Sequence, residues 1–196
     1  MDNFLFKKVY TQSVNPHDLP RLLPSSWNTE RLLVRDATES DVPALQRIYD
    51  ACAYIQDWIG NHDKRENPML SEVRGESLPP DGHKELQRVQ AIIDKTSNEM
   101  LGYIIVYHGY PDPDTFWIAL FGIHPSVQRK GFGKEVINGL GTQVETLGTY
   151  TRMGLGIGVG NDPAMSFWKN CGFTEVIHKE DHGTYVDIWV VKRLGQ

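Results

Sequence analysis

The chain has 196 residues, of which 40% are hydrophobic and 23% are charged. This composition is typical of a globular protein with one ordinary domain and a sizeable core. The 20 basic and 25 acidic residues give a formal net charge of -5, so no global field favours a nucleic acid or an anionic membrane as partner. The two cysteines, Cys52 and Cys171, lie far apart and without metal-ligand spacing, which argues against a disulfide framework or a bound metal.

Residues 1–28 are predicted to form an irregular arm, and residues 29–196 a single domain. Three prolines interrupt any regular element in the arm. Two lysines break the apolar residues of the first ten positions, so these positions lack the apolar centre of a signal peptide, and no window approaches the length of a membrane span. We therefore expect a cytoplasmic protein with no membrane partner.

The first regular elements are predicted to be a strand over residues 30–35 and a helix after it. The sequence Thr38-Glu39-Ser40-Asp41 has the residue types that open a helix. Apolar residues then recur at helical spacing, at positions 42, 45, 48, 49 and 52. This pattern predicts an amphipathic helix with one buried face.

From Gly60 to Leu86 the composition becomes polar and rich in proline, without clear periodicity. This pattern predicts a long loop or a broken helix. Loops of this length within a compact domain often carry function. The segment is therefore a candidate for substrate binding, and a merely solvated insertion is the alternative.

Two predicted strands, residues 88–94 and 99–108, are joined by the turn Lys95-Thr96-Ser97-Asn98 and therefore form a hairpin. A second turn over residues 110–114 leads into the strand Thr115–Ile123. This strand is almost continuously apolar, which is typical of a strand that is covered on both faces.

The segment that follows, Ile123-His124-Pro125-Ser126-Val127-Gln128-Arg129-Lys130-Gly131-Phe132-Gly133-Lys134, joins that strand to an amphipathic helix. Its glycines allow the backbone to approach an anion, and the free amides at the start of the helix point toward it. A dinucleotide fingerprint and a P-loop are both excluded, because Val136 and Glu135 stand where those motifs need a glycine and a Ser or Thr. The turn predicts a phosphate site; a glycine-rich turn with incidental basic residues is the alternative.

Residues 154–160 alternate glycine with Leu155, Ile157 and Val159, so one face of the predicted strand carries no side chains. Glycine weakens a strand unless a ligand or another backbone must come close. The bare face therefore predicts either the floor of a binding site or tight packing against a neighbouring element.

A short helix is predicted within the sequence Asn161-Asp162-Pro163-Ala164-Met165-Ser166-Phe167-Trp168-Lys169-Asn170-Cys171-Gly172-Phe173. Asn161 is suited to cap the helix and Gly172 to stop it. Cys171, beside that stop and without a neighbouring base, is expected to be a small buried residue. Two further strands, residues 174–179 and 185–192, are predicted to end the fold.

The pattern Gln128-x-x-Gly131-x-Gly133 and the Asn161–Phe173 segment resemble the two signatures of the GNAT superfamily of N-acetyltransferases. The opening phrase Thr29–Arg35 is similar to that of the ribosomal-protein N-terminal acetyltransferase group. The predicted order of elements matches that fold over about residues 29–192. The resemblance implies an α/β (α+β) fold with a mixed, mostly antiparallel sheet of six to seven strands, flanked by helices.

The resemblance also implies acetyl-CoA as co-substrate. In this fold the Thr115–Ile123 strand and the glycine-faced strand splay apart, and the pantetheine arm enters between them. The backbone of Phe121 would serve the developing oxyanion. The cofactor-binding residues that it implies are Phe121, Gly122, Ile123, Gln128, Arg129, Lys130, Gly131, Phe132, Gly133, Lys134, Asn161 and Trp168.

Proton transfer is where the sequence departs from the family pattern. The usual positions of a general base are held by Trp117, Ala119 and Gly156, none of which can take a proton. The usual position of the acid that protonates the thiolate is held by Trp168, whose indole can donate a hydrogen bond but not a proton near neutral pH.

Three interpretations of this departure remain. A base can come from elsewhere, directly or through a water, and the candidates are Asp114, Asp112, Tyr110, His108 and Asp187, although Asp114 is distant from Ala119 at ~3.3 Å per strand residue. Solvent can instead deprotonate the amine. Alternatively, the protein is a catalytically weak acyl-CoA-binding or regulatory module.

The leading hypothesis is transfer of an acetyl group from acetyl-CoA directly to a primary amine of a small molecule or peptide. No activated nucleophile is visible, so no covalent intermediate is expected. No nucleic acid is expected as partner, and an exposed final strand would permit a homodimer.

Overall fold

The computed structural model describes residues 20–55, 58, 65–79 and 81–195. Its strands are β1 (Ser26–Asn28), β2 (Leu32–Asp36), β3 (Gln87–Asp94), β4 (Met100–His108), β5 (Thr115–Ile123), β6 (Arg152–Gly158), β7 (Glu175–Asp181) and β8 (Val186–Arg193). Its α-helices are α1 (Val42–Ala51), α3 (Pro68–Arg74), α4 (Phe132–Leu147) and α5 (Asp162–Asn170). Short 3-10 turns cover Glu39–Asp41, Ala53–Ile55, Lys84–Leu86 and Pro125–Val127.

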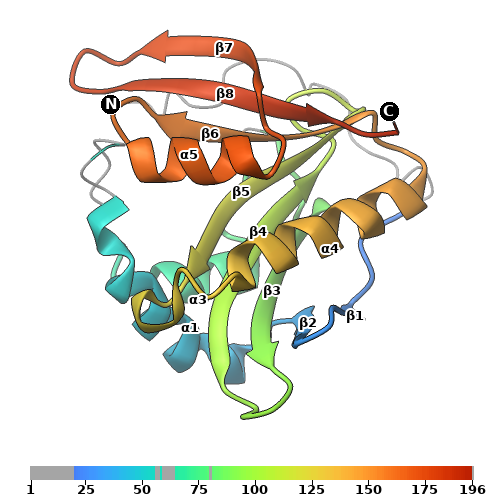
Figure 1. The fold of residues 1–196 in the computed structure, drawn as a ribbon, viewed down its shortest axis with the longest axis vertical. Helices are drawn as coiled ribbons and strands as arrows, with labels where there is room; N and C mark the ends of the chain where they lie inside the picture. The colour runs from blue at the N-terminus through green and yellow to red at the C-terminus, as the bar shows by residue number, and fades with distance from the viewer. Residues whose placement is uncertain (1–19, 56–57, 59–64, 80, 196) are drawn as a thin grey trace.

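The strands form one sheet in the order β1-β2-β3-β4-β5-β6-β8-β7 (Figure 1). Every neighbouring pair is antiparallel except β5 and β6, which run parallel. Helices α4 and α5 cover one face of the sheet, and α1 and α3 lie on the other (Figure 1). The structure thus confirms the predicted mixed, mostly antiparallel sheet flanked by helices.

The sheet has eight strands, one more than the six to seven that were expected. Ser26–Asn28, predicted to be irregular, forms the edge strand β1 and pairs with β2. A strand of three residues is too short for an alternating pattern to be visible in the sequence. Its central residue, Trp27, is buried, and its indole nitrogen donates to Gln90 Oε1 at 2.9 Å, which fixes this strand to β3.

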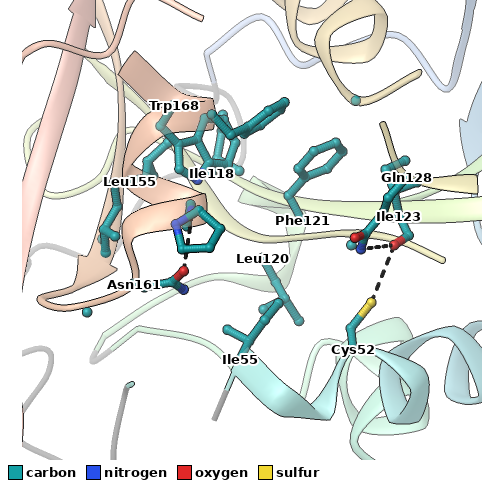
Figure 2. Close-up of a pocket in the computed structure, with 18 of the residues that line it drawn as sticks. Cys52, Ile55, Ile118, Leu120, Phe121, Ile123, Gln128, Leu155, Asn161 and Trp168 are labelled. Carbon is teal, nitrogen blue, oxygen red and sulfur yellow. Dashed lines mark hydrogen bonds between the residues drawn. The ribbon is translucent and has the colours of Figure 1, made fainter. Parts of the chain in front are cut away.

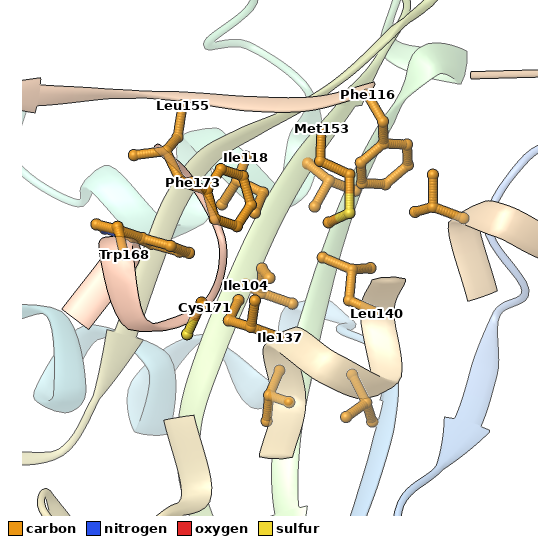
Figure 3. Close-up of a cluster of buried hydrophobic side chains, with 14 of the residues drawn as sticks. Ile104, Phe116, Ile118, Ile137, Leu140, Met153, Leu155, Trp168, Cys171 and Phe173 are labelled. Carbon is orange, nitrogen blue, oxygen red and sulfur yellow. The ribbon is translucent and has the colours of Figure 1, made fainter. Parts of the chain in front are cut away.

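The larger core cluster lies between the sheet and the helices α4 and α5 (Figure 3). The predicted apolar stripe of α4 faces it, with Val136, Ile137, Leu140 and Val144 buried. A second cluster packs α1 and α3 against the opposite face, and alternate residues of β4 point into the two clusters. The predicted β3–β4 hairpin, which supplies this two-faced strand, is confirmed.

The polar segment from Gly60 to Leu86 contains the short helix α3, and residues 59–64 and 80 lie outside the described residues. The side chain of Asn67 caps α3 by accepting from Leu70 N at 3.1 Å, and Gly75 ends it with φ +68°. Met69, fully buried, packs into the cluster of α1. The broken-helix interpretation therefore holds for the middle of this segment.

The final strand β8 is not exposed at an edge, because β6 and β7 pair with it on its two sides. The expectation of a final strand that is free to pair with a second copy was therefore wrong. Strand β7, which precedes β8 in the chain, forms this edge of the sheet and pairs with β8. Within the described ranges, no helix is long and apolar enough to cross a membrane.

Strands β5 and β6 diverge soon after they begin. They pair only over residues 115–117 and 152–154, and beyond this point their backbones separate. The register of β5 against β4 also shifts, so that Ala119 has no partner in the ladder, and such a bulge bends the strand. Ala119 is exposed rather than covered, in contrast to the prediction of a strand covered on both faces. The divergence opens a wedge within the sheet.

Candidate functional site

A cavity of about 610 Å³ occupies the wedge between β5 and β6 (Figure 2). The structure brings most of the predicted cofactor residues to its walls. These residues are Phe121, Gly122, Ile123, Gln128, Arg129, Gly131, Gly133, Lys134, Asn161 and Trp168. Two predicted residues, Lys130 and Phe132, do not line the cavity, and the ring of Phe132 lies against Arg31 instead.

The backbone of β5 presents polar groups to the wedge. His124 N donates to Leu101 O of the strand preceding it in the sheet, β4, at 2.8 Å. Bonded and non-bonded residues alternate along an antiparallel ladder. The N–H and C=O groups of Phe121 and Ile123 therefore face away from β4, toward the gap where β6 no longer pairs. An extended ligand in the wedge would find an unpaired strand edge.

The carbonyl of Ile123 is already bonded within the protein. It accepts from Gln128 Nε2 at 2.8 Å and from Cys52 Sγ at 3.5 Å, as the dashed lines in Figure 2 show. Gln128 Nε2 also lies 3.1 Å from Tyr54 Oη. The side chain of Gln128 thus connects the start of the phosphate turn to the segment after α1, and the N–H of Ile123 is the group that remains for a ligand.

The turn before α4 has the geometry of an anion site. Arg129 and Gly131 have positive φ angles of 60° and 86°, and Gly131 is the N-cap of α4. The first backbone amides of a helix have no partner within it, and the helix dipole adds favourable potential for an anion. Arg129 and Lys134 line the cavity beside these amides and supply positive charge. The turn therefore has a backbone geometry that suits an anion, and the phosphate site itself stays a prediction.

Helix α5 forms the opposite wall. Asn161 Oδ1 accepts from Ala164 N at 3.1 Å, so the predicted cap is confirmed. Phe167 of α5 stacks on Phe121 of β5 with ring centres 6.0 Å apart, and Trp168 lies 5.7 Å from Phe121. These rings close the end of the wedge that faces the core.

Trp168 carries a polar atom without a partner in this apolar wall. The residue is 8% exposed, and its indole N–H donates to no group in the parts of the chain that the structure describes. The indole nitrogen is not among the fully buried side-chain atoms that lack a hydrogen-bond partner, so part of its surface is exposed. Trp168 lines the cavity, so its N–H is a candidate for contact with a ligand there.

The bare glycine face serves both of the predicted purposes. Gly156 and Gly158 line the cavity and form part of its floor. A Cβ at Gly154 would instead lie 3.0 Å from the ring of Trp117, so this glycine permits close packing. The backbone of Trp58 approaches Gly158 so closely that a Cβ there would meet its carbonyl oxygen.

None of the predicted candidate bases lines the cavity. Asp114 accepts from Thr151 Oγ1 at 2.8 Å, and Asp112 is 2.6 Å from Arg152 Nη2, at the end of β5 remote from the wedge. Among the described residues, the titratable side chains that line the cavity are those of Cys52, Tyr54, Arg129 and Lys134.

The other three candidates also have structural environments of their own. His108 is buried on β4 between Leu23 N and Leu86 O. Tyr110 packs 5.3 Å from the ring of Trp117, which does not line the cavity either. Asp187 Oδ1 lies 3.2 Å from His182 Nε2.

The sequence analysis missed several lining residues. Cys52, Tyr54 and Ile55 come from the end of α1 and the turn after it, and Leu120, Pro163, Ala164 and Phe167 complete the walls. Burial raises the pKa of the Cys52 thiol to about 11, so it stays protonated and is no nucleophile at neutral pH. Cys171 is buried as predicted.

Glu180, His182 and Asp187 of the β7–β8 hairpin bring their ligand atoms within 4.8 Å of one another. They do not line the cavity, and such proximity alone does not identify a metal site. A function without a bound metal therefore stays a prediction.

Solved structures share this fold. The acetyltransferase from Salmonella typhimurium that modifies the N-terminal serine of 50S ribosomal subunit protein L7/L12 is 18% identical, with a TM-score of 0.69, over 89% of this chain and 100% of that one. The spermidine N-acetyltransferase from Vibrio cholerae in complex with CoA and spermine is 16% identical, with a TM-score of 0.65, over 83% and 95%. An acetyltransferase from Thermus thermophilus is 21% identical, with a TM-score of 0.65, over 86% and 100%.

At these identities the likeness shows the fold alone. No curated protein sequence matches the chain. The family model described as "Acetyltransferase (GNAT) family" matches residues 45–173, which include the divergent strands, the phosphate turn and α5. This match spans well over half of the chain. The chain therefore belongs to the GNAT family of acetyltransferases.

Proposed function

We propose that the protein is an N-acetyltransferase that moves an acetyl group from acetyl-CoA directly to a primary amine. The observation that carries this proposal is the wedge itself. It has an anion cradle with Arg129 and Lys134 at one end and an unpaired edge of β5 along its side. Phosphates at the cradle and an amide-bearing arm along the strand edge would use both features together.

The backbone at Phe121 is the candidate for polarising the thioester carbonyl. Its N–H faces the gap beyond the last β5–β6 pair, where it has no ladder partner. A fixed amide aimed at developing negative charge stabilises a tetrahedral intermediate without rearranging. The rings of Phe167 and Trp168 pack against the ring of Phe121 and make this part of the wall apolar, which would strengthen the interaction.

Trp168 is the candidate for stabilising the leaving group. Its accessible indole N–H can donate to the sulfur as the C–S bond breaks, but it cannot transfer its proton. In this step the amine nitrogen forms a bond to the carbonyl carbon, and the sulfur departs with the electron pair of the C–S bond. The nitrogen, which is positively charged once it has attacked, releases one proton to water, and water supplies the proton that the thiolate takes up.

Deprotonation of the amine is assigned to solvent. The described residues that line the middle of the wedge, such as Ala119, Leu120 and Gly156, offer no base. Holding a neutral amine against the thioester can by itself lower the barrier substantially. The rate would then rise with pH until the acceptor amine is fully neutral, with no separate ionisation of the enzyme.

The acceptor is assigned to the class of primary amines, on a small molecule or a peptide. The similar structures named above act on spermidine and on an N-terminal serine, so both kinds of acceptor are candidates. Gly156 leaves room for such an acceptor, because no side chain rises from the floor of the wedge there.

The test is release of free thiol from acetyl-CoA in the presence of spermidine, spermine or a peptide with an N-terminal serine. Thiol release above the hydrolysis blank with any of these amines supports the proposal. No release with a broad panel of amines, from protein that binds CoA, would contradict it and favour the second candidate.

That second candidate is an acyl-CoA-binding or regulatory module of the same fold. The specific observation in its favour is the lack of a base among the described residues that line the middle of the wedge. It predicts thermal stabilisation by CoA without turnover.

A further inference from the structure

The contacts of Arg31 lie behind the phosphate turn, on the side away from the cavity. Arg31, in the loop between β1 and β2, reaches across to this turn, although 99 residues separate it from Lys130. Its Nη1 donates to Lys130 O at 3.2 Å, and its guanidinium carbon lies 4.2 Å above the ring of Phe132. Lys130 and Phe132 are the two predicted cofactor residues that do not line the cavity.

Glu135, in the first turn of α4, holds the guanidinium in place. Its Oε2 accepts from Arg31 Nε at 2.6 Å, and its Oε1 accepts from the backbone N of Arg31 at 2.8 Å and from Thr29 Oγ1. The loop is fixed from its other side as well, because Lys95 N donates to Arg31 O at 3.0 Å. Arg31 is thus an anchored side chain rather than a freely moving surface group.

The bond to Lys130 O fixes the orientation of one peptide group. In a trans peptide the C=O and the following N–H point in opposite directions. When Arg31 holds Lys130 O on the outer side of the turn, the N–H of Gly131 must point to the inner side, where Gly131 lines the cavity. This N–H donates to no group within the described ranges, so it is available to an anion.

The same contacts remove an electrostatic conflict. A carboxylate in the first turn of α4 would repel a phosphate bound at the helix N-terminus. Arg31 and Thr29 hold the carboxylate of Glu135 on the outer side of the helix, and Arg31 balances its charge at 2.6 Å. The inner side keeps the unbalanced positive charges of Arg129 and Lys134.

We infer that Arg31 is a positioning residue of the cofactor-phosphate site: it orients the Gly131 amide and neutralises Glu135 without touching the cofactor. This inference rests on the proposed function, since it assumes that CoA phosphates bind at the turn. It assigns the first loop of the domain a part in cofactor affinity.

The experiment compares CoA with pantetheine, which lacks the pyrophosphate and the adenosine, in calorimetric or competition binding. For Arg31→Ala we expect the dissociation constant of CoA to rise about tenfold and that of pantetheine to stay unchanged. Arg31→Lys keeps the charge but cannot bond Glu135 and Lys130 O together, so its CoA affinity should lie between those of the wild type and Arg31→Ala. Because Arg31→Lys is the more conservative substitution, an intermediate CoA affinity in this variant would also argue against misfolding as the cause of the loss in Arg31→Ala.

Arg193→Ala is the matched control, because it removes a similarly exposed, two-bond pair with Glu175 on the β7–β8 hairpin, away from the turn. It should leave both dissociation constants unchanged. A second readout is the amide resonance of Gly131, whose shift on CoA binding should shrink in Arg31→Ala.

Equal weakening of CoA and pantetheine, or unchanged CoA affinity in both Arg31 variants, would overturn the inference while leaving the proposed function intact. Failure of the wild-type protein to bind CoA would overturn both.

Discussion

At the scale of single residues, the site depends on polar groups that lack partners within the protein. Trp168 and Gly131 line the cavity, and the indole N–H of Trp168 and the backbone N–H of Gly131 have no acceptor among the described residues. A polar group that is removed from water without a partner destabilises the folded state. Such groups are therefore candidates for ligand contact, since a ligand can supply the missing acceptor.

Replacing Trp168 by Phe tests this at the leaving group. The change removes the N–H and keeps an aromatic ring in the wall, so acetyl transfer should slow about tenfold while CoA affinity changes little. Steady-state kinetics with a responsive amine would measure both. Phe167→Leu serves as a control for the shape of the wall, and a Trp168→Phe enzyme as fast as the wild type would rule out the role in leaving-group stabilisation.

Gly156 offers a test of the floor of the wedge. Among the described residues, a Cβ at this position would meet the ring of Trp189 alone, at 3.8 Å, so a side chain fits the fold there and is expected to enter the cavity. Gly156→Val should therefore reduce transfer or ligand binding by about tenfold or more, with the melting temperature nearly unchanged.

The matched substitution is Gly141→Ala in α4, where the nearest atom to the new methyl group would be Lys192 Nζ at 3.8 Å. It should leave ligand binding intact and stabilise the helix by about 0.5–1 kcal/mol. Equal behaviour of the two variants in binding assays would show that Gly156 is not part of the floor.

At the scale of elements, His108 at the end of β4 connects two segments that precede it in the chain. Its Nε2 accepts from Leu23 N at 2.9 Å, so its Nδ1 carries the proton and donates to Leu86 O at 2.7 Å. Burial lowers the pKa of His108 from 6.5 to about 4. Protonation would place a second hydrogen on Nε2, against the N–H of Leu23, and break this connection.

Acid should therefore destabilise the protein through His108. Because the folded-state pKa lies below the unfolded one, the neutral form contributes stability that is complete above pH 6.5 and is lost as pH falls toward 4, by up to about 3 kcal/mol. Urea unfolding at several pH values measures this loss. In His108→Gln the stability should depend less on pH across this window, and an equally steep dependence in the variant would contradict the assignment.

Elements encoded by local sequence could be predicted, and those that depend on distant contacts could not. The hairpin, the stripe of α4 and the cap at Asn161 follow from residue periodicity and capping chemistry, and all are present. Strand β1 depends on pairing with β2, which three residues cannot signal. Cys52 and Tyr54 reach the cavity only because α1 packs beneath β5, and no motif marks them.

In the candidate site too, features set by local sequence could be predicted and those set by distant contacts could not. The motifs placed the phosphate turn and α5 at the cavity, but not which side of the turn Lys130 and Phe132 would face. Both residues contact Arg31, which approaches from the first loop and is remote from the turn in sequence. The candidate bases Asp112 and Asp114 do not line the cavity, because proximity along the chain to β5 says nothing about which end of the strand opens into the wedge.

At the scale of the whole molecule, charge is distributed unevenly. The chain carries a formal net charge of -5, whereas the described charged residues that line the cavity are the cations Arg129 and Lys134. A local positive site in an acidic protein attracts phosphates specifically rather than polyanions in general. The dependence of CoA binding on ionic strength should therefore be stronger than that of pantetheine binding.

Thermal stability should report cofactor binding directly. CoA at one hundred times its dissociation constant adds about 2.7 kcal/mol, which raises the melting temperature by roughly 5–10 °C for a chain of this length. Differential scanning fluorimetry with CoA, pantetheine, ATP and NAD measures the shift. A shift with ATP or NAD but not with CoA would instead identify a nucleotide site and contradict the proposal.

The short junction of β5 and β6 has a mechanical consequence. Three residue pairs join a block of five strands to a block of three, so the sheet is continuous in topology but divided in its hydrogen bonding. A ligand that bonds along β5 inside the wedge would act as a removable strand and brace the two blocks against each other. Amide exchange in β5 and β6 should then slow on CoA binding, while the β3–β4 hairpin, which is already paired along most of its length, keeps the same exchange rate.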